Sequence, residues 1–237
     1  MTFLILSVFF NFGRKSWSRF WPGLLSICVN QGSNTQLSVF IANVFISLVY
    51  LFCLMDFNGF ASLLKKQDST KKEIQKAIKK IGKEVLQLHD DTGQTIVHVC
   101  ATEGRTDILD FLCERFKVNL DQKDTHGWTP IICATLGAKL DTIDFLLKKG
   151  VDSSITTSDN ATCLHYYAKI KPNNKDEYES VYKKITKHLN NVDGANKNGE
   201  TPLHKAVREG NIDFLKLLLA SKANVNALDR YKSRAKV

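Results

Sequence analysis

The chain has 237 residues, of which 43% are hydrophobic and 24% are charged, with only 4 prolines and 13 glycines. This is the composition of a globular protein, and it excludes a largely disordered, collagen-like or low-complexity chain. The net charge of +9 is unevenly placed: residues 1–89 hold 11 basic and 4 acidic residues, whereas the rest of the chain is nearly balanced. A nucleic-acid-binding domain carries a clustered basic face, and the larger part of this chain supplies none.

Residues 1–58 form a hydrophobic N-terminal segment. Within it, residues 37–55 contain no charged side chain and are interrupted only by Ser38, Asn43 and Ser47. A helix of this length rises about 28 Å, close to the hydrocarbon thickness of a bilayer. The alternative, a helix buried in a soluble core, would need covering sequence that residues 1–36 hardly offer. We therefore predict a single membrane-spanning helix over 37–55.

Basic residues flank this span unequally. Three precede it, and eight lysines lie between residues 65 and 83 on its C-terminal side. Positive charge marks the cytoplasmic side of a membrane protein. The C-terminal part of the chain is therefore predicted to face the cytoplasm, and a wholly cytoplasmic protein is the alternative.

Residues 59–89 are predicted to form a basic linker and an amphipathic helix from about Lys71 to Leu88. Apolar residues recur at intervals of three and four along this helix, which places them on one face. The sequence Thr70-Lys71-Lys72-Glu73 has the form of a capping box. Two compatible interpretations stay open: the helix caps the unit that follows, or its lysines attract anionic lipid.

The remaining chain repeats one pattern four times around a threonine. Thr95, Thr129, Thr162 and Thr201 are spaced 34, 33 and 39 residues apart, and each stands near a turn residue and before a short apolar stretch. A period in the low thirties is typical of stacked helical repeats. Proline follows two of these threonines, at the first helical position, where its missing N–H costs nothing.

This pattern resembles the ankyrin repeat, whose signature is Thr-Pro-Leu-His-x-Ala after a Gly-x-Thr turn. Residues 201–206, Thr-Pro-Leu-His-Lys-Ala, are the nearest copy of it. The resemblance implies an all-α fold, an ankyrin-repeat solenoid of helix–turn–helix units with hairpin-like loops, over residues 90–229. The expected repeats are 90–123, 124–157, 158–196 and 197–229, and residues 230–237 are an incomplete next repeat or a tail.

The second and third repeats depart from the family pattern. In the second, Ile132 replaces the histidine, and Ala138 replaces the glycine between the helices. In the third, Asn160 replaces the turn glycine, and an insertion over 172–177 is expected to lengthen the loop between the two helices. Tyr167 stands where the family has alanine, so we expect it to enter the core and force local repacking.

No motif indicates catalysis, a cofactor or a metal. The six cysteines form no Cys-x-x-Cys pair, and neither a phosphate-binding glycine loop nor a Gly-x-Ser-x-Gly elbow occurs. His98, His165 and His204 share one position in their repeats, where the family uses histidine to brace neighbouring turns. We therefore predict buried free thiols and a non-enzymatic protein with no cofactor, metal, nucleic acid or small-molecule substrate.

Ankyrin repeats bind proteins through their turn tips and the exposed side of their first helices. By position, the tip residues predicted to bind a protein are Gln94, His126, Trp128 and Glu200, and Ala161 is at the equivalent tip of the third turn. The first-helix residues are Leu136, Tyr166, Lys205 and Arg208, with Val99 and Cys133 at equivalent positions expected to be exposed. Trp128 stands out because aromatic anchors dominate interface energetics; the alternative is that its ring packs on the neighbouring turn.

These features predict a non-catalytic scaffold or adaptor that binds a protein of unknown identity and is tethered to a membrane through residues 37–55. An alternative is the targeting portion of a larger signalling enzyme or small-GTPase regulator whose catalytic domain lies outside these residues. A third interpretation keeps the scaffold and treats residues 1–58 as incidental to function.

Overall fold

The structure, a computed structural model, describes residues 57–187, 189 and 191–235, apart from the side chain of Glu84. These residues belong to one compact unit of the chain. The membrane helix predicted over 37–55 lies outside the described residues. Among the residues that are described, no helix combines the length and the apolar character needed to cross a bilayer.

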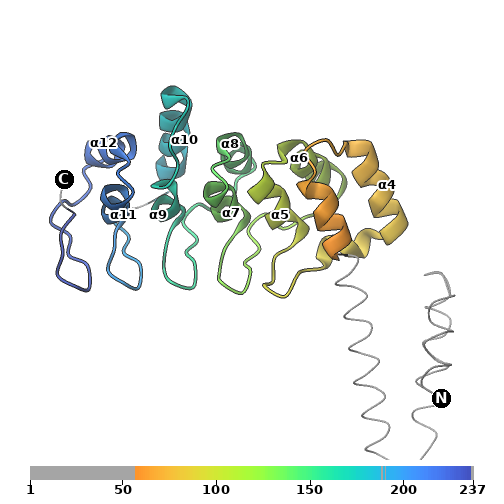
Figure 1. The fold of residues 1–237 in the computed structure, drawn as a ribbon, viewed down its shortest axis with the longest axis horizontal. Coiled ribbons are helices and arrows are strands. Elements are labelled where there is room, and N and C mark those ends of the chain that lie inside the picture. Colours follow the sequence, from red (N-terminus) through yellow and green to blue (C-terminus); the bar gives the residue numbers. More distant parts are fainter. Residues whose placement is uncertain (1–56, 188, 190, 236–237) are drawn as a thin grey trace, which may run out of the picture. The chain divides into compact units, whose positions relative to one another are not determined.

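Four helix pairs make up most of the described structure, and they stack side by side in two layers (Figure 1). The first helices are α5 (Ile96–Glu103), α7 (Pro130–Leu136), α9 (Cys163–Tyr167) and α11 (Pro202–Arg208). The second helices are α6 (Thr106–Arg115), α8 (Leu140–Lys148), α10 (Lys175–Lys187) and α12 (Ile212–Ala220). Each helix contacts its counterpart in the next pair. Because the described residues contain isolated β-bridges but no strand, the fold is the expected all-α solenoid.

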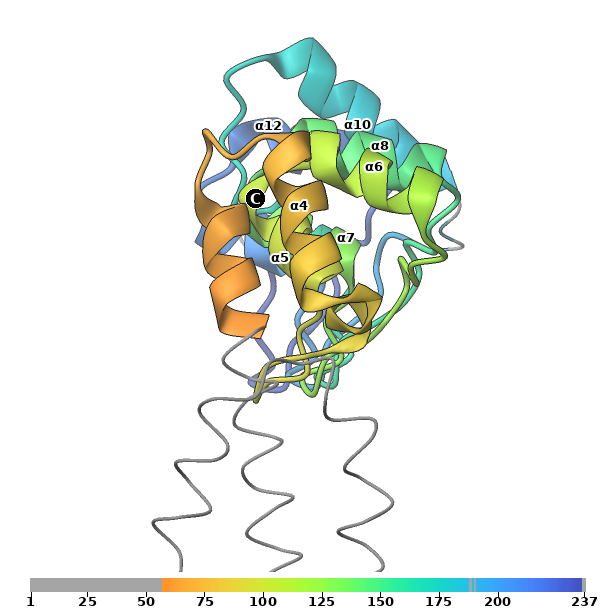
Figure 2. The same cartoon turned by 90° about the vertical axis from the view of Figure 1, so that its right-hand side faces the viewer.

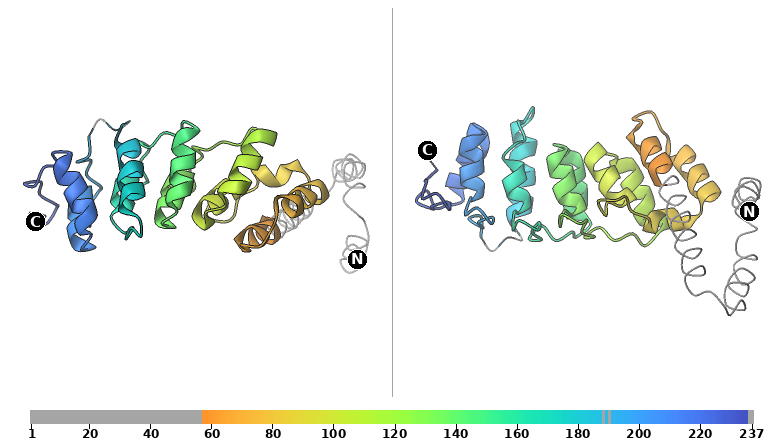
Figure 3. Two further views of the ribbon diagram at one scale, coloured as in Figure 1. Left: turned by 90° about the horizontal axis from the view of Figure 1, so that it is seen from above. Right: turned by 60° about the horizontal axis from the view of Figure 1, so that its bottom comes forward.

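A hydrogen-bonded turn precedes each first helix, and the views in Figure 3 show these turns along one edge of the stack. In the second turn, Oδ1 of Asp124 accepts the backbone N–H groups of His126 and Trp128 at 2.9 and 2.8 Å. The equivalent acceptors are Asp90, Thr157, Asn196 and Asp229. One residue in each turn adopts a positive φ between 58° and 78°: Gly93, Gly127, Asn160, Gly199 and Lys232. The turn therefore forms in the third unit without glycine, and it also forms over 229–233.

The repeated threonines begin the first helices, and three of them do so together with a histidine. In the first unit the backbone N–H of Thr95 donates to Nδ1 of His98 at 3.1 Å. Nδ1 must then be the acceptor nitrogen, and Nε2 carries the hydrogen that it donates to the carbonyl of Trp128 at 3.1 Å. The same arrangement joins His165 to Glu200 and His204 to Ser233. Each histidine thus links its own unit to the next turn, as predicted.

Two cap helices precede the repeats, where the sequence predicted a linker and one helix. Residues 57–65 are helical, and Phe57, Phe60 and Leu64 on this segment are buried. Their spacing of three or four residues places them on one face, which packs into the core. The stretch predicted to be a basic linker is therefore in part a packed helix.

The second cap helix is α4 (Lys71–Ile81), which begins with the predicted capping box of Thr70 and Glu73. Its predicted continuation to Leu88 is wrong. Gly82, with a φ of 109°, ends α4, and a short 3-10 helix, η2 (Lys83–Gln87), follows. The apolar periodicity continues through Gly82 because Val85 on η2 is buried as well, so the pattern alone did not reveal the break.

Arg105 joins this cap to the first repeat. Its side chain is 5% exposed and donates hydrogen bonds to the carbonyls of Leu64 and Lys66 at 3.1 and 2.9 Å. It also donates to Oγ of Ser69 at 2.7 Å and pairs with Asp107 at 3.2 Å. A buried guanidinium is costly unless its donors find partners, and here the cap supplies most of them.

The third unit is repacked around Tyr167, which is buried as expected. Its ring stacks on Tyr178 of α10 with centroids 4.5 Å apart, and its hydroxyl donates to the carbonyl of Tyr178 at 2.7 Å. Burial raises the pKa of Tyr167. Half of the insertion predicted to be loop, from Lys175 on, instead lengthens α10, which rises beyond its neighbours in Figure 1.

Candidate protein-binding surface

The eight residues predicted to bind a protein come from the turns and the first helices, and we call them the recognition strip. Figure 2, which looks along the stack, shows the turns projecting from its lower edge, away from α6, α8, α10 and α12. His126 and Arg208 are exposed, and the other six are partly buried. The strip therefore combines accessible side chains with residues anchored in the stack.

An aromatic cluster occupies the middle of the strip. The rings of Trp128 and Tyr166 meet edge to face with centroids 6.2 Å apart, and the ring of His126 lies 5.7 Å from that of Trp128. The backbone of Trp128 is held at both ends, because Asp124 accepts its N–H and His98 donates to its carbonyl. The indole thus packs on the next unit, and part of it stays open to solvent.

A charged cluster lies toward the C-terminal end of the strip. Nζ of Lys205 is 2.8 Å from Oε2 of Glu200, Arg208 pairs with Oε1, and Nδ2 of Asn196 donates to Oε2 at 2.9 Å. Burial alone would raise the pKa of Glu200, but the hydrogen bonds from Lys205 and Asn196 and the charges of both cations bring that pKa to about 2. The carboxylate is therefore ionised at neutral pH, and one positive charge is left over.

Two first-helix positions expected to be exposed are buried: Val99 is 7% and Cys133 is 2% exposed. The cause is the close approach of α5 and α7, since a methyl group at Gly137, the residue that ends α7, would overlap the carbonyl oxygen of Thr102 near the end of α5. Ala161, at the tip of the third turn, is buried as well, at 5% exposed. The apolar part of the strip is therefore Trp128, Leu136 and Tyr166.

Asp124 positions two of the predicted residues, although it was not among the residues predicted from the sequence. Its side chain is buried, its Oδ1 closes the turn that carries Trp128, and its Oδ2 accepts a hydrogen bond from Nε2 of Gln94 at 3.4 Å. The signal was present, because Asp and Asn side chains close turns by accepting backbone N–H groups two residues on. Gln94 is consequently tied to the second turn.

The cysteine and histidine side chains that the structure describes are poorly suited to metal binding or nucleophilic catalysis. Within 57–187, 189 and 191–235, no group of three or more His, Cys, Asp or Glu side chains is placed to hold a metal ion. Burial raises the pKa of Cys133 and of Cys163 to about 12, so both thiols stay protonated and poorly nucleophilic. Burial also lowers the pKa of His98 and His165, whose ring nitrogens are already engaged in the inter-unit links.

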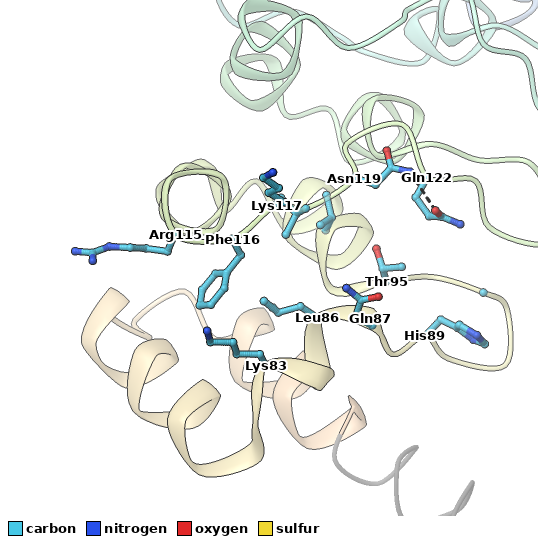
Figure 4. Close-up of a pocket in the computed structure, with 13 residues that line it drawn as sticks. Lys83, Leu86, Gln87, His89, Thr95, Arg115, Phe116, Lys117, Asn119 and Gln122 are labelled. Atoms are coloured by element: carbon cyan, nitrogen blue, oxygen red, sulfur yellow. Dashed lines mark hydrogen bonds between the residues drawn. The ribbon is translucent and has the colours of Figure 1, made fainter.

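A pocket of about 530 Å³ lies beside the cap, between η2, the first turn and the segment after α6 (Figure 4). Its lining includes the apolar residues Leu86, Val97, Phe116 and Val118 and the cations Lys83, Arg115 and Lys117. None of the described residues that line it is acidic. Figure 4 shows Arg115 and Lys117 pointing in different directions, so the cations do not converge on one point as they do around a small ligand.

Comparison with known proteins identifies the repeats. The family model for ankyrin repeats (three copies) matches residues 67–157 and 139–229. This match begins within the cap, before the first repeat predicted from the sequence.

Three curated relatives match parts of the same region. A protein described as a probable serine/threonine-protein kinase of Dictyostelium discoideum is 29% identical over 133 residues, covering 54% of this chain and 15% of the relative. An ankyrin repeat-containing protein of Schizosaccharomyces pombe is 33% identical over 82 residues, covering 33% and 35%. Inversin of Canis lupus familiaris is 31% identical over 141 residues, covering 59% and 12%. The chain thus spans about a third or less of the length of these relatives.

Proposed function

Because the chain belongs to the ankyrin repeat family, we propose that it is a non-catalytic scaffold whose recognition strip holds a partner protein. Ankyrin repeats are interaction modules, and the motifs of this chain indicate no catalytic chemistry. The observation that carries the proposal is the aromatic pair of Trp128 and Tyr166, partly exposed at the middle of the strip. Large aromatic side chains of this kind are the usual energetic centres of interfaces.

The strip is preorganised for such a role. The hydrogen bonds to Asp124 and from His98 fix the backbone of Trp128 before any partner arrives. Little backbone entropy remains to be lost on binding, so more of the contact energy contributes to affinity. The chemistry of the strip favours a partner with an apolar side chain over Trp128 and Leu136 and a carboxylate near Arg208, which is exposed.

The test is quantitative capture of partner proteins by the full chain and by Trp128→Ala. Phe145→Ala is the matched control, because Phe145 is also partly buried and lies on α8 in the opposite layer. We expect Trp128→Ala to reduce recovery of the principal partner at least tenfold, since hot-spot truncations cost about 2 kcal/mol or more. Phe145→Ala should leave recovery unchanged. Equal recovery by wild type and Trp128→Ala contradicts the proposed site.

We also propose that residues 37–55 tether the scaffold to a membrane and leave the repeats on the cytoplasmic side. The support is the uncharged run itself and the excess of lysine that follows it. Carbonate extraction of membranes from cells that make the full chain tests the tether. Retention in the membrane pellet is expected, and complete release to the wash would leave the cytoplasmic alternative.

A second candidate function is the targeting portion of a larger signalling enzyme. It is favoured by the relatives, which include kinases and of which this chain matches only a minor part. Sequencing the transcript beyond the codon for Val237 tests it. An in-frame continuation into a kinase or other catalytic motif would support this alternative, and an immediate stop codon would remove it.

A further inference from the structure

The end of the stack formed by α4 carries a concentration of positive charge that protein binding by the recognition strip does not use. Eight lysines and two acidic residues lie between residues 65 and 83, and all eight lysines are exposed. None of the eight forms an ion pair with an acidic side chain that the structure describes.

Elsewhere in the stack, cations are commonly paired. Asp144 pairs with both Lys148 and Lys184, and Asp110 lies 3.2 Å from Lys149. The hydrogen bonds and charges of its two lysines hold the pKa of Asp144 below its usual value, although burial opposes this. What distinguishes the cap is therefore the clustering of its lysines without acidic partners, eight within 19 residues.

The lysines of α4 occupy one face. At about 100° per residue, Lys72, Lys76, Lys79 and Lys80 project together, opposite Ile74 and Ile78, which are buried. We call these four residues the lysine face. Like charges three and four residues apart on a helix repel one another, and none of these four lysines forms an ion pair with a described acidic side chain.

The pocket beside η2 is also lined by basic side chains. Lys83, the first residue of η2, is separated from α4 only by Gly82, and it lines the pocket together with Arg115 and Lys117 and with no described acidic residue. Positive charge therefore continues from the lysine face around the edge of the cap.

We propose that the lysine face binds the anionic surface of a membrane. Clusters of four to eight basic residues close to a hydrophobic segment attract anionic headgroups, and α4 begins 16 residues after the uncharged run 37–55. Residues 65–83 contain no aromatic side chain on which the bases of a single-stranded nucleic acid could stack. The proposal rests in part on the proposed membrane association, so its test must separate the two.

The experiment uses the full chain synthesised in the presence of vesicles of phosphatidylcholine alone or of phosphatidylcholine with phosphatidylserine. Flotation on the neutral vesicles reports the tether, whatever the lysine face does. A lysine-acetylating reagent followed by mass spectrometry then reports how far each lysine is shielded. We expect Lys72, Lys76, Lys79 and Lys80 to react several-fold more slowly on the vesicles that contain phosphatidylserine.

Four exposed lysines on the repeats serve as internal controls: Lys171, Lys187, Lys216 and Lys222. Their acetylation should be the same on both kinds of vesicle. Raising the ionic strength should abolish the shielding of the lysine face, because salt screens exposed charges.

A matched pair of charge variants completes the test. One replaces the four residues of the lysine face by glutamine, a residue of similar helix propensity, and the other replaces the four control lysines. Each lysine near an anionic surface contributes roughly a fivefold factor in partitioning, so the first variant should lose at least tenfold of any binding that depends on phosphatidylserine. The second variant should keep it.

Equal acetylation of the lysine face on both vesicles, or equal losses in both variants, overturns the proposal. So does retention of the full chain by RNA or duplex DNA that depends on the lysine face without any shielding by phosphatidylserine. Failure to float on neutral vesicles would contradict the tether alone, because the anionic vesicles still test the lysine face.

Discussion

The first and second repeats contain the same elements but are held to their neighbours by different contacts. In the first, His98 accepts the N–H of Thr95 and donates to the next turn. In the second, Ile132 stands at the histidine position, and Oγ1 of Thr129 is buried without a hydrogen-bond partner. The second repeat therefore lacks the polar link and retains an unsatisfied hydroxyl.

The two repeats also differ at a second position. Ten residues after the threonine, Arg105 in the first repeat reaches back to the cap. Lys139 occupies this position in the second repeat and lies along Gly104. The second repeat is instead packed closely on the first, through the approach of Gly137 to Thr102. The first repeat is thus attached to the unit before it through a buried guanidinium, whereas the second repeat is attached to the unit before it through close helix packing together with the hydrogen bond from His98.

The largest expected effect comes from replacing Arg105, which attaches the first repeat to the cap. Arg105→Ala should lower the free energy of unfolding by about 3 kcal/mol, because buried carbonyl groups of the cap lose a charged donor and Asp107 loses its partner. Lys139→Ala, the matched change in the second repeat, should cost less than about 1 kcal/mol. Urea unfolding of the two variants measures both values, and equal losses would contradict the assigned role of Arg105.

The next largest effect concerns the dependence of the free energy of unfolding on pH. Burial lowers the pKa of His98 and His165, so the folded protein favours their neutral forms. Their contribution to stability is complete above the ordinary histidine pKa of about 6.5. It is lost as the pH falls below that value, because the unfolded chain binds protons first.

Urea unfolding as a function of pH checks this expectation. Replacing both histidines by isoleucine, as at Ile132, should make the stability less dependent on pH below about 6.5, even though the variant is less stable throughout. An unchanged pH dependence would mean that other groups cause the acid loss.

A smaller effect is expected from introducing the missing histidine link into the second repeat. Ile132→His should raise the free energy of unfolding by about 1 kcal/mol. Its Nδ1 would accept from Thr129, and its Nε2 would donate to the carbonyl of Ala161, which already accepts the N–H of Thr157 and has a second lone pair. Ile132→Met changes the side chain without adding nitrogen and should give no gain. Chemical unfolding distinguishes the two variants.

The smallest effect is expected from removing the unsatisfied hydroxyl group of Thr129. Thr129→Val should be neutral or stabilise by up to about 1 kcal/mol, because no hydrogen bond is lost. Thr95→Val should destabilise by about 1 kcal/mol, since its Oγ1 lies 2.9 Å from Nδ1 of His98 and takes part in the capping box. Thermal unfolding of the pair checks the difference, which would vanish if both hydroxyl groups had equivalent surroundings.

Most of the repeat architecture was predictable because its signals act over short distances. A threonine caps the helix that begins at the next residue, and a histidine three residues on completes that cap. The burial of Tyr167 was also foreseen, because a large ring at an alanine position must enter the core.

The positions that were missed depend on groups distant in sequence. Val99 and Cys133 are buried because two first helices meet closely at Gly137. Arg105 finds its partners about 40 residues earlier in the chain. The candidate strip follows from repeat position, but the turn signal of Asp124 does not show that this residue holds the tryptophan, because aspartate is common in turns of every kind.

The amino-acid sequence alone determined the repeat period, the starts of the first helices and the positions that can face a partner, because each follows from a residue and its near neighbours. Only the tertiary structure decided which of those positions stay accessible, how the cap is attached and where a polar group is left without a partner. These outcomes depend on which unit packs against which, and contacts about 30 to 40 residues apart set them.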